Sequence, residues 1–425
     1  MSFHNTSLYI IPVSVGDAIK MTDELLLSGS WEWDHTLGVP NYLLHYVHGL
    51  ATDRERFRVL SYREPSSLPI SVAGGKRRYS SRPSIDAIYL CAFGTGVAFL
   101  EFRVSYGDMT VDEIIDFAYH FKKADAADQR GLLKEGEISL MTAARRLLMV
   151  ERTNAELFFS YRNSFQSNCI CYHMIHLSGE QAEREDVDRL CFYLKRSYDS
   201  AYLYDKSNDG SEYDMIYKPY SYMTWAGCQE GLVHIASDTD NEKTNRFLNG
   251  YHFTNLMRDY HFTYLLLLNQ RFTSLKYIDA LASITDDTEE VERISAASAI
   301  LKTRYSFRVV SDEMVYQNIY SDMYRIFHID KLLLDVADCG SRMEGVEAAE
   351  SKHHEKTTSS LLLALSVLAL FSALVDASGY FDRMFPHMNI ATIVGTGSVI
   401  GVFLLVLGKT VVDFFRSRRQ RKRHK

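Results

Sequence analysis

The sequence predicts an α+β fold: an α/β-type cytosolic domain, then long stalk helices and a C-terminal hairpin of two transmembrane helices. Three observations lead to this prediction. Apolar runs of strand type alternate with helical patterns up to residue 240, residues 251–339 contain neither glycine nor proline, and two long uncharged segments follow residue 356. We therefore expect four parts, which are the α/β domain 1–240, the helical stalk 241–356, the transmembrane helices 357–408 with their external loop 376–387, and the basic cytoplasmic tail 409–425.

The α/β-type domain is predicted from its strand-like runs and from two turn signals. Gly94-Thr95-Gly96 joins two of the runs and predicts a β-hairpin. Thr110 and Glu113 have the spacing of a capping box, which predicts that a helix opens here and continues over 112–121. The strand-like runs are 7–15, 57–62, 87–93, 97–106 and 168–177.

A second stretch of the domain repeats the order of the first hairpin. Residues 222–235 echo residues 89–100, and each stretch is followed by a polar turn and a helical pattern that ends in Tyr-His-Phe, at 119–121 and at 251–253. A diverged internal duplication and a chance similarity between two amphipathic hairpins both remain open.

The stalk is predicted from helical spacing in a segment without helix breakers. Asp286, Asp287 and Thr288 precede the acidic residues Glu289 and Glu290, a pattern typical of a helix start. Apolar residues then recur at helical spacing, at Val291, Ile294 and Leu301 and again at Val315, Ile319, Met323 and Ile326. We interpret Gly340 and Gly345 as a hinge just before the first uncharged segment.

Composition and charge favour a globular protein and argue against one that binds nucleic acid. Of the 425 residues, 46% are hydrophobic and 24% are charged, a balance typical of globular domains. The formal net charge is −7, and the last ten residues, 416–425, hold seven Lys or Arg, so removing those seven positive charges leaves −14 for residues 1–415. An acidic body without a basic stripe argues against nucleic-acid binding, which needs many cations against the phosphates.

The two uncharged segments have the length of membrane spans. Residues 357–375 number 19 and residues 388–408 number 21, and about 20 apolar residues are needed to cross a hydrocarbon core. Loop 376–387 contains one Arg and no Lys, whereas Lys352 and Lys356 precede the first span and the basic tail follows the second. The positive-inside rule therefore predicts a protein of the inner (plasma) membrane with both termini in the cytoplasm and the lipid bilayer as its partner.

The amino-terminal segment lacks a basic region and has only a short apolar run, so we expect no secretory signal and a cytosolic body. Its six cysteines should then be thiols, because disulfides are rare in a reducing compartment.

Two stretches resemble metal sites, and for both we favour a structural interpretation. Cys169, Cys171 and His173 alternate on an expected strand, where they span about 13 Å, too far for one tetrahedral zinc ion, so we interpret them as buried strand packing. Residues 205–214 imitate the start of a calcium loop, but its twelfth position is Ile216 instead of a carboxylate, which favours a surface turn. We therefore predict no metal site.

A short basic loop is the candidate ligand site of the cytosolic domain. Lys76, Arg77 and Arg78 follow Gly74-Gly75 and together with backbone amides could hold a phosphate, although the spacing of a P-loop is absent and a mobile loop is the alternative. The sequence contains no GxSxG, HExxH or Walker motif, so we expect no enzyme. The cofactor or ligand is left open between a divalent cation and a nucleotide.

Small and partly polar residues form a stripe along the first span. At 100° per residue they share one face about 100° wide, which either lines a pore in an oligomer or provides close helix packing, and both interpretations remain open. In the pore interpretation, Asp376 places a ring of carboxylates at the outer mouth and concentrates cations. Gly397 and Gly401 in the second span indicate a helix contact. The stripe consists of Ser359, Leu362, Ser366, Ala369, Ala373 and Asp376.

A large cytosolic α/β domain, a long helix continuing into the first span, a short external loop, a second span and a basic tail together resemble the CorA-like two-transmembrane-helix superfamily. In the external loop Gly379 is followed by Tyr380 and Phe381 where that family has Met and Asn, and Pro386 lies near its Met-Pro turn. The resemblance implies a homopentamer with the first spans around the axis. CorA-like proteins that lack the Gly-Met-Asn tripeptide also occur as membrane effectors of bacterial antiviral systems, opened by a nucleotide messenger, and the chain resembles that group as well.

Three hypotheses for the function follow. The first is an oligomeric membrane ion channel or transporter with a large cytosolic regulatory domain. The second is a nucleotide-messenger-gated membrane effector of a bacterial antiviral defence system. The third is a non-conducting, membrane-anchored scaffold or an unrecognised enzyme.

Overall fold

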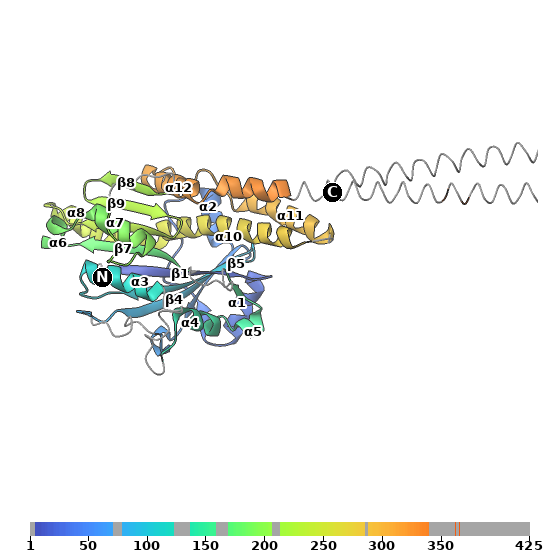
Figure 1. Ribbon diagram of the computed structural model, residues 1–425, viewed down its shortest axis with the longest axis horizontal. Coiled ribbons are helices and arrows are strands. Elements are labelled where there is room, and N and C mark those ends of the chain that lie inside the picture. The colour runs from blue at the N-terminus through green and yellow to red at the C-terminus, as the bar shows by residue number, and fades with distance from the viewer. Residues whose placement is uncertain are drawn as a thin grey trace, which may run out of the picture. The chain divides into compact units, whose positions relative to one another are not determined.

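A computed structural model shows a mixed α+β fold built around one large β-sheet (Figure 1). The structure describes residues 5–70, 79–122, 137–158, 169–205, 213–284 and 288–339, together with residues 362 and 365. The chain divides into two compact units, Met1–Gly340 and Ser341–Lys425, and the sheet belongs to the first.

The sheet has ten strands in the order β2-β3-β4-β5-β1-β7-β10-β9-β8, with β6 paired to β1 beside this path. β7 and β10 run parallel, whereas the other pairs are antiparallel. The strands are β1 (Thr6–Ser14), β2 (Trp31–Trp33), β3 (Phe57–Tyr62), β4 (Ser84–Phe93), β5 (Val97–Ser105), β6 (Glu156–Leu157), β7 (Ile170–Leu177), β8 (Met215–Tyr220), β9 (Met223–Cys228) and β10 (Gly231–Ser237).

Helices connect and cover these strands. One continuous helical stretch joins α8, η4, α9, η5 and α10, and η4 and η5 within it are π-helical turns. The helices are α1 (Ala18–Leu27), α2 (His45–Thr52), η1 (Pro65–Ser67), α3 (Val111–Lys122), α4 (Leu140–Leu147), α5 (Val150–Thr153), α6 (Glu180–Arg184), α7 (Val187–Arg196), α8 (Glu242–Phe247), η4 (Leu248–His252), α9 (Phe253–Asn255), η5 (Leu256–Tyr260), α10 (His261–Ser283), α11 (Thr288–Arg304) and α12 (Met314–Ile326).

The local signals in the first half are confirmed. The predicted hairpin forms between β4 and β5, with Phe93 opposite Val97 across the turn. The capping box is made in both directions: the Thr110 amide donates to Glu113 Oε2 over 2.8 Å, and the Glu113 amide donates to Thr110 Oγ1 over 3.3 Å. Helix α3 therefore starts where its cap predicts, because two otherwise unpaired amides find acceptors there.

The two hairpins that suggested a duplication join the sheet differently. β5, the second strand of the first hairpin, lies antiparallel to β1, whereas β10, the second strand of the other hairpin, lies parallel to β7. The similar sequence order therefore corresponds to two hairpins with different neighbours in the sheet.

Successive side chains of the strands point to opposite faces of the sheet, and each face carries a core. On one face, Tyr9, Ile11 and Val13 of β1 pack with apolar residues of α1, α3, α4 and α7. On the other face, Tyr172 and Phe99 meet Tyr264 and Phe272 of α10, with ring centroids 5.9 and 6.2 Å apart. The strands thus lie between two helical layers (Figure 1).

The boundary predicted at residue 240 between an α/β domain and a stalk lies inside one compact unit. Residues 1–340 form one compact unit, and α10 packs directly on the sheet. Its Leu265–Leu268 run is buried, as are the polar Asn269 and Gln270 that follow. A helix that is apolar around most of its circumference is stable only between other elements, here the sheet on one side and α11 and α12 on the other.

The helices predicted for the remaining stretch are confirmed as local elements. α11 begins at Thr288 with Glu289 and Glu290 in its first turn, and its spaced residues Ile294 and Leu301 are buried. In α12 the spaced residues Ile319, Met323 and Ile326 are buried. After a turn at 327–328, residues 329–339 form a further helix.

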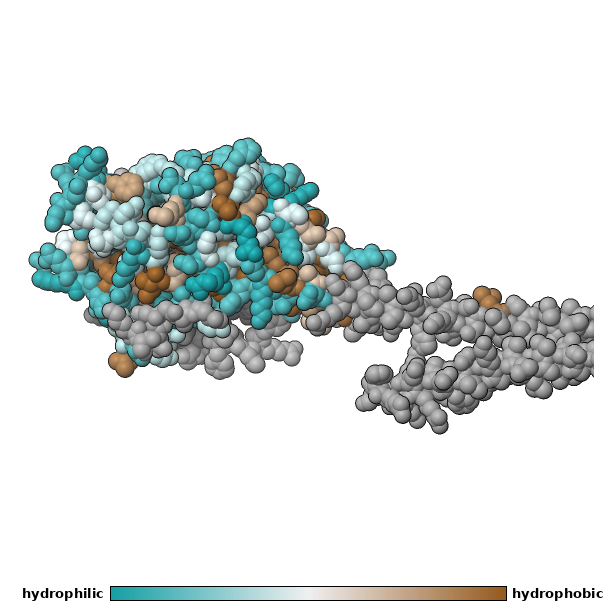
Figure 2. Space-filling model, turned by 90° about the horizontal axis from the view of Figure 1, so that it is seen from above, coloured by the Kyte–Doolittle hydropathy of each residue, from teal (hydrophilic) through white to brown (hydrophobic). Residues whose placement is uncertain are grey.

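Figure 2 shows one face of the molecule, on which hydrophobic side chains occur in small groups between hydrophilic ones. Within the described ranges, no helix has both the length and the hydropathy needed to cross a membrane. Both predicted spans, 357–375 and 388–408, lie outside those ranges except for Leu362 and Leu365, which are helical and exposed.

Candidate functional site

A cavity of about 400 Å³ lies between loop 33–40, the start of β3 and the helical stretch around residue 260. Its walls are largely apolar, and five of its side chains are arginines or histidines. The basic residues are Arg54, Arg58, Arg258, His35 and His261, and the larger apolar ones are Trp33, Leu37, Val39, Phe57, Val59, Met257, Phe262 and Leu265.

The loop that closes one side of the cavity, residues 34–44, is called the strap below. Its first turn is shaped by Asp34, whose carboxylate accepts from the amides of Thr36 and Leu37 over 3.0 and 2.9 Å. Gly38 follows with φ +71°, and a Cβ there would lie 3.4 Å from Arg258 Cδ. Glycine suits both the left-handed backbone and the close approach to the arginine.

The second half of the strap is held by Asp259, which is fully buried. Its Oδ1 accepts from the amides of Asn41 and Tyr42 over 2.6 and 2.9 Å, and its Oδ2 accepts from Arg258 Nε over 2.9 Å. A carboxylate buried in this way is stable only with such compensation. Asp259 therefore fixes both the strap and the guanidinium that lines the cavity.

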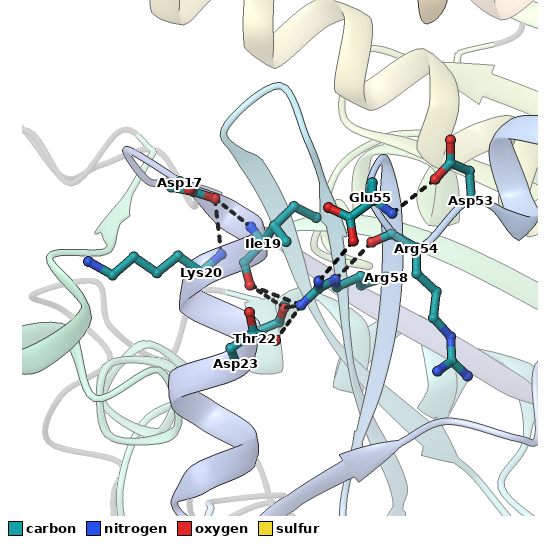
Figure 3. Close-up of polar contacts among 9 residues, drawn as sticks. All are labelled: Asp17, Ile19, Lys20, Thr22, Asp23, Asp53, Arg54, Glu55 and Arg58. Carbon is teal, nitrogen blue, oxygen red and sulfur yellow. Dashed lines mark hydrogen bonds and ion pairs between the residues drawn. The ribbon is translucent and has the colours of Figure 1, made fainter.

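Arg58 is already engaged by its neighbours (Figure 3). Its guanidinium points toward α1, where Nη1 donates to Thr22 Oγ1 over 3.0 Å and pairs with Asp23 over 2.5 Å. Its Nε donates to the carbonyl of Arg54 over 2.8 Å. Arg58 thus anchors β3 to α1 and adds positive potential to the cavity without offering an unpaired charge.

Among the described residues that line the cavity, Arg54 is the arginine without a carboxylate partner. Figure 3 shows its side chain extending away from the contacts of Arg58. The guanidinium carbon lies 4.4 Å from the ring centroid of Trp33, a cation–π arrangement. Within the described residues no carboxylate lies at ion-pair distance from Arg54, in contrast to Arg58 and Arg258.

The inner wall holds a buried contact between an imidazole and a carboxyl group. His261 Nε2 lies 3.0 and 2.9 Å from the two carboxylate oxygens of Glu101, and both residues are buried. Cys91 lies nearby, and burial, followed by the negative charges of Glu101 and Asp34, raises the pKa of its thiol well above the usual range. Cys91 therefore stays protonated and is a poor nucleophile.

The chemistry of the cavity suits a small anion with a flat or apolar part. Apolar walls with a few placed polar groups are typical of ligand sites, and a guanidinium binds phosphate or carboxylate oxygens through two parallel hydrogen bonds. The aromatic face of Trp33 beside Arg54 can stack on a planar group.

The predicted site residues fall mostly outside the described part of the chain. There lie the basic-loop residues Lys76, Arg77 and Arg78, the hinge glycines Gly340 and Gly345, the stripe residues Ser359, Ser366, Ala369, Ala373 and Asp376, the loop residues Gly379, Tyr380, Phe381 and Pro386, and the packing glycines Gly397 and Gly401. Of the stripe, Leu362 alone is described.

The interpretation of Cys169, Cys171 and His173 as buried strand packing is confirmed. Within the described ranges, no group of three or more His, Cys, Asp or Glu side chains is arranged to hold a metal ion. Sequence reasoning did not foresee the contact of His173, whose Nδ1 lies 2.6 Å from the hydroxyl of Ser7. Burial opposes ionisation of Cys171, but hydrogen bonds from Cys169 and His173 and the charge of a nearby lysine lower its pKa well below the usual value.

The cavity residues themselves were missed by sequence reasoning. Trp33, Arg54 and Arg258 come from the end of strand β2, a turn and a π-helical turn, and they belong to no motif. Two weak signals were present: the alternating arginines of Arg54-Glu-Arg-Phe-Arg58, and the strap composition with Gly38 and Pro40, typical of a shaped loop.

No protein-family model, curated protein or solved structure matches this chain. The proposal for its function therefore depends on its own residues and geometry.

Proposed function

We propose that the chain is an oligomeric, CorA-like membrane ion channel or transporter whose first compact unit, residues 1–340, is a receptor domain for a small anionic ligand. The ligand site is the cavity between the strap and η5. Two kinds of observation support the proposal: the membrane part rests on the sequence, and the receptor part on the cavity.

One observation carries the receptor half, namely the guanidinium of Arg54 stacked on Trp33 at the cavity without a carboxylate partner among the described residues. An anion that binds Arg54 gains a charge-assisted hydrogen bond without displacing a carboxylate from that guanidinium, whereas Arg58 and Arg258 are paired with Asp23 and Asp259 in the structure. Such a site favours anions over neutral ligands of the same shape.

The second hypothesis, a nucleotide-gated effector of the antiviral type, is favoured by the combination of groups in this cavity. A nucleotide carries a planar base and a phosphate, and the cavity pairs the aromatic ring of Trp33 and the apolar wall around Phe262 with the guanidinium of Arg54. A volume of about 400 Å³ lies within the range of small-ligand sites.

For the membrane half, the two uncharged segments and the positive-inside pattern support two spans in the inner membrane with both termini in the cytoplasm. The stripe that ends in Asp376 supports a cation path along the first span of a homopentamer. The bilayer and further copies of the chain are then its partners, and no nucleic acid is needed.

The test is ion flux from liposomes that contain the purified full-length protein. Potassium and magnesium flux is measured before and after addition of ATP or inorganic pyrophosphate on the side of the receptor domain. Flux that depends on ATP supports the nucleotide-gated effector, and flux with pyrophosphate alone supports a simpler anion receptor.

Constitutive magnesium flux that ignores both anions supports a transporter and contradicts the receptor half. An oligomer that stays silent under all conditions contradicts the channel and leaves the scaffold hypothesis. Arg54→Gln should remove the anion dependence, whereas the matched Arg56→Gln should keep it, because Arg56 pairs with Asp53 and does not line the cavity.

A further inference from the structure

The second half of the strap, beyond the residues that line the cavity, is bonded to the connection between α11 and α12. The Leu44 amide donates to the carbonyl of Val310 over 2.9 Å, and the Ser311 hydroxyl donates to the carbonyl of Tyr42 over 2.5 Å. Just past the strap, the hydroxyl of Tyr46 donates to the carbonyl of Val309. One short loop thus lines the cavity with its first half and contacts this connection with its second.

A stack of tyrosine rings reinforces the link. Tyr42 of the strap stacks on Tyr316 of α12 with centroids 5.7 Å apart and planes 19° apart. Tyr316 in turn stacks on Tyr260, the last residue of η5, with centroids 4.0 Å apart and planes 10° apart. The strap, α12 and the turn that carries Arg258 therefore share one packed contact.

The turn η5 is itself an unusual element. It is a π-helical turn within a continuous helix, and such single-turn bulges occur often at functional sites because they redirect side chains. Here the turn directs Met257 and Arg258 to the cavity wall and Asp259 to the strap amides. One helical turn thus joins ligand cavity and strap.

Asp259 links the strap to the charge of the cavity wall. Asp259 holds the strap through Oδ1 while its Oδ2 is balanced by Arg258. An anion in the cavity competes with Asp259 for that guanidinium and repels the carboxylate through an interior of low dielectric. The hydrogen bonds to Asn41 and Tyr42 are then weakened.

We propose that the pair Arg258–Asp259 is an anion-operated switch, in which an occupied cavity releases the strap and loosens its contacts with residues 309–316. The inference rests on the proposed function, since it describes how binding at that ligand site changes the rest of the domain. From the released contacts the change passes into α12 and the helix 329–339, which continue the chain toward Gly340, where the first unit ends.

The test delivers an anion to the cavity whatever the natural ligand is. Thr52 lines the cavity and is exposed, and Cys339 is the cysteine that is not buried, so the full-length variant Thr52→Cys, Cys339→Ser has one accessible thiol within the described residues. That thiol is labelled with 2-sulfonatoethyl methanethiosulfonate or with its neutral hydroxyethyl analogue as the matched control. Hydrogen exchange is then followed by mass spectrometry.

We expect the sulfonate, and not the neutral label, to speed exchange several-fold in both 41–46 and 309–316, because loosened hydrogen bonds open more often. Faster exchange in 41–46 alone, in neither segment, or equally with the neutral label would overturn the inference. Asp259→Asn should speed exchange in both segments without any label. Asn318→Ala, on α12 but bonded to Tyr217 instead of the strap, should leave 41–46 unchanged.

Flux from liposomes with the same labelled protein separates this inference from the proposed function. If both segments respond to the sulfonate and flux does not, the switch stands and the gated channel fails. If flux responds while 309–316 does not, the channel stands and the switch fails.

Discussion

His252 and His234 face each other in the interior, with their Nε2 atoms 3.0 Å apart. Only one of the two nitrogens can donate in this contact, so at least one ring is neutral. Trp225 and Tyr260 pack around the pair, and His176, itself bonded to Asp238, lies close enough to disfavour its protonation. A buried neutral pair of this kind makes the fold sensitive to acid.

We expect the free energy of unfolding to fall between pH 6.5 and pH 4. Burial, then the charge of His176, lowers the pKa of His252 from 6.5 to about 4, and burial lowers the pKa of His234 well below its usual value. As the pH falls, these histidines are protonated in the unfolded chain before they are protonated in the folded one. Their contribution to the free energy of unfolding is therefore complete above pH 6.5 and is lost at lower pH. For His252 alone, the loss in the free energy of unfolding is about 2 kcal/mol at pH 5.

Urea unfolding at pH 7 and pH 5 measures this loss. His252→Gln should reduce the difference, whereas His48→Gln, an exposed control, should not. An equal loss in all three proteins would show that other groups cause the acid sensitivity.

Lys276 should make the free energy of unfolding depend on pH at the alkaline end of the range. Its Nζ donates to the carbonyls of Val15 and Gly96 over 2.7 and 3.0 Å, and burial, then Arg293, lowers its pKa from 10.5 to about 8. Between pH 8 and pH 10.5, Lys276 is protonated more often in the unfolded chain than in the folded one. The free energy of unfolding of the wild type therefore increases as the pH rises through this range. The cost of Lys276→Met should therefore be larger at pH 9 than at pH 7, by about 1 kcal/mol. A cost independent of pH would contradict the lowered pKa.

The pair Glu101–His261 should show strong coupling. Glu101→Leu or His261→Leu leaves one ionisable partner buried, which costs about 3 kcal/mol. The double variant removes both groups, and its loss should be clearly smaller than the sum of the two single losses. A double-mutant cycle measured by chemical denaturation tests this, and additive losses would mean that the two side chains do not interact.

Arg54→Gln should weaken binding of pyrophosphate or ATP about tenfold, a loss typical of one charge-assisted hydrogen bond. Isothermal titration at low salt measures the affinity, with Arg56→Gln as the matched variant. Equal affinity of the Arg54 variant and the wild type would remove Arg54 from the ligand site.

Asp376→Lys should reverse the preference of the proposed pore from cations to anions, because a ring of positive charge at the outer mouth excludes cations. The reversal potential in planar bilayers under a salt gradient reports this preference. Asp382→Lys, in the same external loop but off the stripe, is the control. Unchanged selectivity in the Asp376 variant would favour the interpretation of the stripe as helix packing.

The sequence by itself determined the local elements of this protein, because their causes lie within a few residues. The turn at Gly94–Gly96 defines the hairpin, and Thr110 with Glu113 defines the start of α3. Apolar spacing likewise located α11 and α12, since helical periodicity repeats within four residues. The mixed α+β class follows from these local signals.

Only the tertiary structure decided that the helical stretch after residue 240 packs on the sheet and that a cavity forms beside it. Arg258 reaches the strap across more than 200 residues of sequence, and Asp259 binds the Asn41 amide only because η5 and the strap fold together. Such contacts leave no local pattern, because they depend on strand order and on which face of an all-round apolar helix meets the sheet. The charge and hydrogen bonding of the cavity arise from that packing, and the ligand selectivity that we propose for it depends on the same packing.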